Sequence, residues 1–202
     1  PQWDALMDIV EPYEYRHRLS LPKYILNSTG DEFFLPDSSQ FYWRDLVGEK
    51  HLRYVPNSNH SMADTDIYDS VDAWYHSIVH NVKPPRYSWD LSEDGTITVF
   101  SIDKPEKVLL WQAHNPDKRN FTQEVIGKAY SSSPLPESEP GVYKVKLDPP
   151  ATGFTAYYVE MHYPSGIETP FKFSTGVKVV PDITEHTWEF KPCLLYTSPS
   201  PR

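Results

Sequence analysis

Residues 21–60 read LPKYILNSTGDEFFLPDSSQFYWRDLVGEKHLRYVPNSNH and contain two short apolar runs. The first run is Tyr24 to Leu26, and the second is Leu52 to Val55. Short apolar runs that end at Asn, Gly or Pro are typical of buried parallel strands. The stretch therefore predicts two neighbouring strands, with the loop at Asp31 after the first and the loop at His60 after the second.

Three segments around these strands have the pattern of helices. Pro1 to Val10 reads as the end of an amphipathic helix, and Asp37 is a good N-cap for a short helix between the two strands. A third helix is expected to begin at Asp64 or Thr65. Its apolar positions fall within about one third of the helix circumference, so we expect that face to pack on a sheet. These positions are Ile67, Val71, Trp74, Tyr75, Ile78 and Val79.

Lys83-Pro84-Pro85 is the predicted domain boundary, because a stiff proline break follows a complete helix there. Beyond it the hydrophobic period changes from that of a helix to that of a strand, as in Tyr143, Val145 and Leu147. About seven short strands separated by turns favour an immunoglobulin-like or fibronectin-type β-sandwich. The strands are expected near residues 86–91, 95–102, 107–114, 121–126, 141–148, 153–163 and 170–180.

The composition argues against several classes of partner. The chain has 19 Lys and Arg against 28 Asp and Glu, a net charge of −9, and no basic run. Nucleic acid is therefore not an expected partner. No apolar stretch is as long as a membrane span, so we expect no membrane-spanning helix in this sequence. Cys193 is the single cysteine, which leaves no pair for a disulfide within the chain.

Both ends of the chain suggest that it is a piece of a longer protein. Pro1 falls inside a predicted helix, so we expect an internal fragment that is truncated at its N-terminus. The last ten residues, Cys193 to Arg202, read CLLYTSPSPR. They can be back-translated into a transposase sequencing adapter read in frame. We therefore interpret residues 193–202 as an adapter-derived tail and leave them out of the fold.

Asp31 and His60 are the candidate catalytic residues. Each lies just past a predicted strand, and functional loops of a parallel sheet gather at the carboxyl ends of its strands. A carboxylate that orients a histidine supplies two members of a hydrolase triad, in the chain order serine, acid, histidine of the α/β-hydrolases. The serine would lie upstream of Pro1. Glu32 and Asp37 are rival acids, and an ordinary turn aspartate beside a loop histidine is the simpler alternative.

Two other residue patterns have weaker chemical interpretations. His76 and His80 have the spacing of metal ligands on a helix, but the helical wheel places them opposite the apolar face. We interpret them as solvated and expect neither a metal nor a cofactor. An aromatic run beside Asp31 either lines an acyl or peptide pocket or belongs to the core. It comprises Phe33, Phe34, Phe41, Tyr42 and Trp43.

Four stretches carry a resemblance to a known family. They are residues 12–62 (PYEYRHRL to PNSNHSM), 108–121 (VLLWQAHNPDKRNF), 153–164 (GFTAYYVEMHYP) and 173–182 (FSTGVKVVPD). Together they resemble the PhoPQ-activated pathogenicity-related protein family, which includes autocrine proliferation repressor proteins. The resemblance implies an α/β-hydrolase followed by a β-rich domain, with Asp31 and His60 as acid and histidine of its triad.

The expected fold class is α/β plus all-β. Residues 1–83 are expected to be the C-terminal part of an α/β-hydrolase-like domain, and residues 84–192 an immunoglobulin-like or fibronectin-like β-sandwich. The first functional hypothesis is a serine hydrolase that acts on a small ester or peptide through an acyl-enzyme. The alternative is a catalytically degenerate signalling or binding protein with a cell-surface partner, and secretion is implied by the resemblance alone. A third role is that the β domain is a lid or brace.

Overall fold

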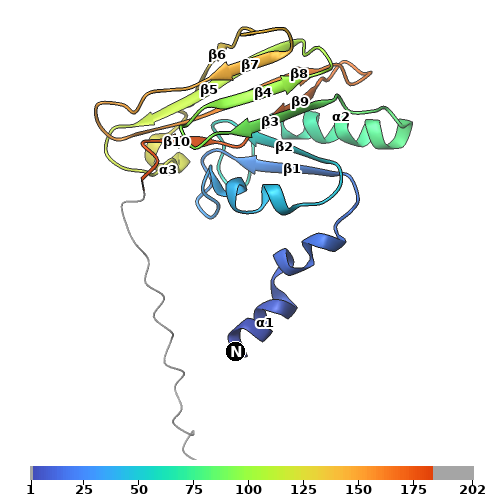
Figure 1. Cartoon of the computed structure of the whole chain (residues 1–202), viewed down its shortest axis with the longest axis horizontal. Helices are drawn as coiled ribbons and strands as arrows, with labels where there is room; N and C mark the ends of the chain where they lie inside the picture. The colour runs from blue at the N-terminus through green and yellow to red at the C-terminus, as the bar shows by residue number, and fades with distance from the viewer. Residues whose placement is uncertain (1, 184–202) are drawn as a thin grey trace, which may run out of the picture.

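The two predicted strands pair in parallel in the computed structural model, which describes residues 2–183 (Figure 1). They are β1, Lys23–Ser28, and β2, Lys50–Val55. In their register Ser28 lies opposite Val55, so both strands end at the same edge. The expected adapter-derived tail, residues 193–202, lies outside the described residues.

The segments before and between these strands are helical, as predicted. Helix α1, Gln2–Val10, confirms the amphipathic helix; it lies away from the sheets in Figure 1 and leads into the 3₁₀ helix η1, Pro12–Arg18. The short helix predicted between the strands, with Asp37 at its N-cap position, is present but is 3₁₀ rather than α-helical. The chain forms two 3₁₀ turns there, η2, Ser38–Phe41, and η3, Trp43–Asp45. Asp37 makes no side-chain cap, because its carboxylate is paired with Arg119.

Helix α2, Ile67–His80, is present, but the prediction of its buried face is wrong. Its N-cap is Asp66 rather than Asp64 or Thr65. The buried positions are the small residues Ser70, Ala73 and Ser77, which let the helix approach strand β9 closely. Several predicted core positions are instead exposed to solvent. The exposed fractions are 44% at Val71, 66% at Tyr75, 55% at Ile78 and 55% at Val79.

The described chain after α2, residues 81–183, is called the β-rich part and contains two antiparallel sheets. One has the order β3-β4-β7, and the other has the order β10-β8-β5-β6, with β9 also paired to β8. The bounds are β3, Tyr87–Leu91; β4, Ile97–Ser101; β5, Lys107–Asn115; β6, Ser131–Pro134; β7, Val142–Val145; β8, Phe154–Tyr163; β9, Phe171–Ser174; and β10, Lys178–Val180.

Most of the predicted strands are confirmed, and three differences have local causes. Residues 121–126 do not form a strand: Thr122 is the N-cap of a short helix, α3, Gln123–Ile126. The single strand expected over 170–180 is divided into β9 and β10. Strand β6 was missed because its sequence, SSSP, has no apolar alternation and all its residues are exposed at the edge of β5.

Strand β8 is buried on both faces. Tyr157, Val159 and Met161 share a core with β4 and β5, while Ala156 and Tyr158 share another with Leu52 and Tyr54 of β2. The β1–β2 pair therefore packs on the five-stranded sheet through Leu52 and Tyr54 of β2, and His51 of the same strand also reaches Tyr87 of β3. The chain is a mixed fold of helix and mostly antiparallel sheet.

His51 of β2 lies among the aromatic rings of Trp74, Tyr87 and Phe173, between the β1–β2 pair and the β-rich part. Its ring stacks on Phe173 with 4.4 Å between centroids, and its Nδ1 lies 3.0 Å from the Tyr87 hydroxyl. The residue is only 6% exposed. Burial lowers the pKa of His51, although the neighbouring Glu49 carboxylate acts in the opposite direction. The folded chain therefore favours the neutral ring.

This burial predicts an acid-sensitive fold. The unfolded chain binds a proton at His51 near pH 6.5, whereas the folded chain resists it, so stability is lost as the pH falls below that value. We expect His51→Gln to flatten the dependence of the free energy of unfolding on pH, by at most about 1.4 kcal/mol per pH unit. Urea unfolding between pH 5 and 8 would measure this. His80→Gln is the control, and equal slopes in His51→Gln and wild type would contradict the prediction.

Candidate functional site

The structure brings the two predicted site residues together at the carboxyl edge of the β1–β2 pair. Asp31 follows β1 and His60 follows β2. One oxygen of Asp31, Oδ2, lies 3.0 Å from His60 Nδ1. Asp31 is buried, and the His60 side chain is 50% exposed. The pair thus consists of a buried carboxylate and a histidine ring that faces solvent on one side.

The Asp31 carboxylate is held in its charged form. Burial by itself raises the pKa of Asp31, but hydrogen bonds from the Phe33 and Phe34 N–H groups and from His60 outweigh burial and lower it. The two N–H groups donate to Oδ1 over 2.8 and 3.1 Å. A charged carboxylate only accepts hydrogen bonds, so Nδ1 of His60 is the donor. In the neutral ring Nε2 is then free of hydrogen and can accept a proton.

The contacts of Glu32 and Asp37, the two rival acids, differ from those of Asp31. Glu32 accepts the backbone N–H of His60 at 3.2 Å rather than contacting the ring. Asp37 is occupied by Arg119. Phe33 and Phe34 flank the ring, with centroids 4.9 and 5.9 Å away, and both are largely exposed. Of the predicted aromatic run, these two therefore lie beside the candidate site.

The other three aromatic residues lie elsewhere. Trp43 stacks on Trp89 of β3 with 5.2 Å between centroids. The Tyr42 hydroxyl accepts a hydrogen bond from Asn27 at the end of β1. Phe41 is 74% exposed. Only part of the aromatic run is therefore available to line a pocket beside Asp31.

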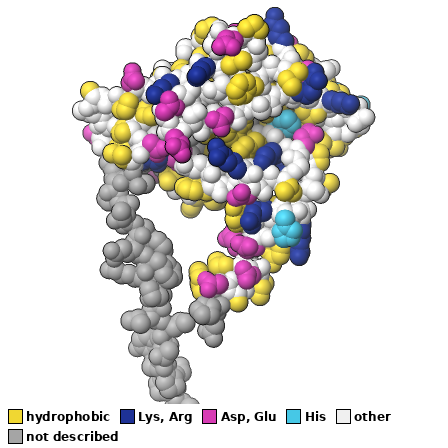
Figure 2. All heavy atoms as spheres, viewed as in Figure 1, with side chains coloured by type: hydrophobic (Ala, Val, Ile, Leu, Met, Phe, Trp, Pro, Cys, Tyr) yellow, Lys and Arg dark blue, Asp and Glu magenta, His cyan; other side chains and the backbone are white. Residues whose placement is uncertain are grey.

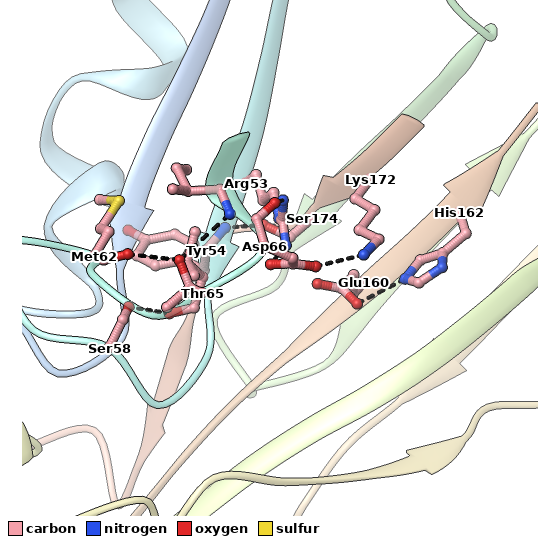
Figure 3. Close-up of polar contacts among 12 residues, drawn as sticks. Arg53, Tyr54, Ser58, Met62, Thr65, Asp66, Glu160, His162, Lys172 and Ser174 are labelled. Carbon is pink, nitrogen blue, oxygen red and sulfur yellow. Dashed lines mark hydrogen bonds and ion pairs between the residues drawn. The ribbon is translucent and has the colours of Figure 1, made fainter. Parts of the chain in front are cut away.

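The loop that carries His60 is fixed at its far end by an ionic cluster that includes one fully buried arginine. Asp66 lies between Arg53 of β2 and Lys172 of β9 and pairs with both (Figure 3). Arg53 is 1% exposed. Burial raises the pKa of Asp66, but the two cations outweigh this effect and lower it. Sequence reasoning missed this cluster, because its three members lie in separate elements and share no motif.

Gly30 brings the two loops into direct contact. Its N–H donates to the Ser58 carbonyl over 2.9 Å, and its own carbonyl accepts the N–H of Gln123 over 3.0 Å. A Cβ at Gly30 would lie 2.8 Å from Ser58 O and 2.9 Å from Gln123 N. Both contacts are to backbone, so any side chain at this position would force the loops apart.

The two histidines with the spacing of metal ligands are neighbours in the structure. His76 and His80 lie side by side on α2, with 4.4 Å between ring centroids. Within residues 2–183, however, no three His, Cys, Asp or Glu side chains are grouped so that they could hold a metal ion.

No helix within residues 2–183 is long and apolar enough to cross a membrane. On the face seen in Figure 2, cationic and acidic side chains are interspersed.

Comparison with known proteins identifies the family. The family model described as PhoPQ-activated pathogenicity-related protein matches residues 1–122. The chain belongs to this family. Autocrine proliferation repressor protein A of Dictyostelium discoideum is 34% identical over an alignment of 226 residues, which covers 98% of the chain and 45% of that relative.

The predicted resemblance is therefore confirmed, and the chain spans less than half the length of this curated relative. No solved structure matches the chain. Because the PhoPQ-related match covers residues 1–122, it includes both Asp31 and His60.

The hydrogen bond between Asp31 and His60 predicts the ring tautomer. In its neutral form, the His60 ring should carry its hydrogen on Nδ1. We expect Asp31→Asn to shift the population toward the Nε2–H form, because an amide can donate to Nδ1. Long-range ¹H–¹⁵N spectra of the histidine rings, with His60 assigned from His60→Gln, would measure this. Glu32→Gln is the control, and an unchanged spectrum in Asp31→Asn would contradict the assignment.

Proposed function

We propose that this chain is the C-terminal part of a serine-hydrolase-like protein of the PhoPQ-related family. Residues 1–83 then belong to an α/β-hydrolase-like domain, and residues 84–192 form an appended immunoglobulin-like or fibronectin-like sandwich. Asp31 and His60 are the acid and histidine of the triad, and the serine is contributed by sequence upstream of Pro1. The 3.0 Å contact between Asp31 Oδ2 and His60 Nδ1 carries the proposal.

The geometry supports general base catalysis by His60. Asp31 engages Nδ1, so Nε2 is the nitrogen left to take a proton from a serine hydroxyl. The hydroxyl oxygen then attacks the carbonyl of a small ester or peptide, and the charged Asp31 stabilises the imidazolium. His60 returns the proton to the leaving group, and an acyl-enzyme forms that water hydrolyses by the same route.

The surroundings of the pair fit this chemistry. The lowered pKa of Asp31 keeps a negative charge beside the ring over the range in which the histidine works as a base. Phe33 and Phe34 place apolar surface next to His60, where the acyl or peptide side of a substrate would lie. Their position is coupled to the acid, since their N–H groups bind the Asp31 carboxylate.

A second candidate is a catalytically degenerate signalling or binding protein. The observation in its favour is the relative at 34% identity, which is named a proliferation repressor rather than an enzyme. In this case the protein is secreted and acts on a cell-surface partner. His60→Ala separates the candidates: a signalling role leaves the repressor activity of the full-length protein intact, whereas a hydrolytic role abolishes it.

Fluorophosphonate labelling of the full-length protein tests the first candidate. We expect the wild type to be labelled at a serine, and His60→Ala and Asp31→Asn to slow labelling by roughly 10³- to 10⁴-fold, because the base and its orienting acid are lost. The second-order rate constant can be followed by fluorescence in a gel.

His80→Ala is the matched control, since it removes an exposed histidine from α2 and should be labelled at the wild-type rate. Two results would overturn the hydrolase proposal. One is labelling of His60→Ala at the wild-type rate. The other is a folded wild-type protein that is not labelled at all, which would favour the second candidate.

A further inference from the structure

We infer that Gln123, from the β-rich part, is a positioning residue that sets the geometry of the Asp31–His60 pair. This inference rests on the proposed function of that pair. Gln123 is the first residue of α3 and contacts both loops. Its backbone N–H donates to the Gly30 carbonyl over 3.0 Å, and its side-chain amide donates to the Asn57 carbonyl over 3.2 Å.

Each contact lies close to a candidate catalytic residue. Gly30 immediately precedes Asp31, and Asn57 comes shortly before His60 in the loop after β2. One residue therefore joins the loop of the acid to the loop of the histidine. The Gln123 N–H is free for this purpose because the first N–H groups of a helix have no partner inside the helix.

Gln123 thus forms a bridge between the two loops, and Asn57, which accepts its side-chain amide, is itself held in place by several contacts. Its φ of 55° lies in the left-handed region, which asparagine tolerates better than most residues. Its side-chain amide donates to the Tyr130 carbonyl and its side-chain oxygen accepts the Tyr130 N–H, both over 2.9 Å. Its own N–H donates to the Thr29 hydroxyl over 3.0 Å. Asn57 is thus fixed both to the end of β1 and to the β-rich part.

The bridge leaves the two loops little freedom. Gly30 is hydrogen-bonded through its N–H to Ser58 and through its carbonyl to Gln123, so the acid loop is held on both sides. The Gln123 side chain holds the histidine loop through its hydrogen bond to the Asn57 carbonyl. A shift of about 1 Å between catalytic groups is enough to slow a reaction about 100-fold. The distance between the Asp31 loop and the His60 loop therefore matters for the rate.

A different role for Gln123 would be only to hold the β1–β2 pair and the β-rich part together. Another hydrogen bond between these two parts allows that role to be tested. The Tyr24 hydroxyl donates to the Lys172 carbonyl over 2.6 Å, and so links β1 to β9 without touching either loop. If Gln123 only stabilised the packing of the two parts, its loss and the loss of this hydroxyl would have the same consequences. A positioning role predicts that only the loss of Gln123 disturbs His60.

The test uses Gln123→Met in the full-length protein, because methionine has a similar length and no N–H to donate. Tyr24→Phe is the matched control. The first readout is the ¹⁵N spectrum of the His60 ring, which needs no enzymatic activity. The second is the fluorophosphonate labelling rate, together with kcat and KM for p-nitrophenyl butyrate. If Gln123→Met does not fold, as judged by circular dichroism, Gln123→Ala is measured in the same way.

We expect Gln123→Met to shift His60 toward a mixture of ring tautomers, and to lower the labelling rate and kcat by about 10-fold with KM nearly unchanged. Tyr24→Phe should leave all of these at wild-type values. An unchanged His60 spectrum in folded Gln123→Met would overturn the inference, as would equal spectral changes in Tyr24→Phe. If the wild type is not labelled, the proposed function fails, and the spectra alone decide the role of Gln123.

Discussion

The parallel pairing of β1 with β2 is the constraint on which the candidate site depends. Ser28 lies opposite Val55 at the end of this register, so the chain leaves both strands at one edge. Asp31 and His60 each follow within a few residues, and the loops are too short to carry them far apart. A shift of one position along either strand would turn its side chains to the opposite face and separate the two loops. The contact between Asp31 and His60 is therefore a consequence of strand register.

The β-rich part holds this pairing in place. Two parallel strands alone expose too much backbone and apolar surface to be stable, and here β2 packs on Ala156 and Tyr158 of β8. The loop after β2 is fixed at its near end by Asn57 and at its far end by Asp66, and each residue is bound by groups from the β-rich part. Such a site would lose its geometry if the β-rich part were displaced. This arrangement develops the brace hypothesis, since the brace reaches the loops themselves.

Local patterns in the sequence were enough to predict β1, β2, α2 and the proximity of Asp31 and His60, because each depends on periodicity or on strand ends. They failed where packing between distant segments decides the outcome. The buried face of α2 is formed by Ser70, Ala73 and Ser77, and hydrophobicity cannot reveal a face chosen for close approach. Gln123 was hidden for the same reason: it contacts Asn57 across 66 positions, and its segment resembles a strand. Family resemblance added the expected roles of the pair, which no local pattern contains.

The most direct test is a crystal structure of the full-length protein after reaction with a fluorophosphonate. It would show which residue carries the phosphonyl group and where His60 lies relative to it. If Asp31 and His60 are the acid and base of a triad, the modified residue is a serine upstream of this chain, with its Oγ about 3 Å from His60 Nε2 while Nδ1 remains bound to Asp31. A modified serine far from His60, or a His60 ring turned away from Asp31, would contradict these roles.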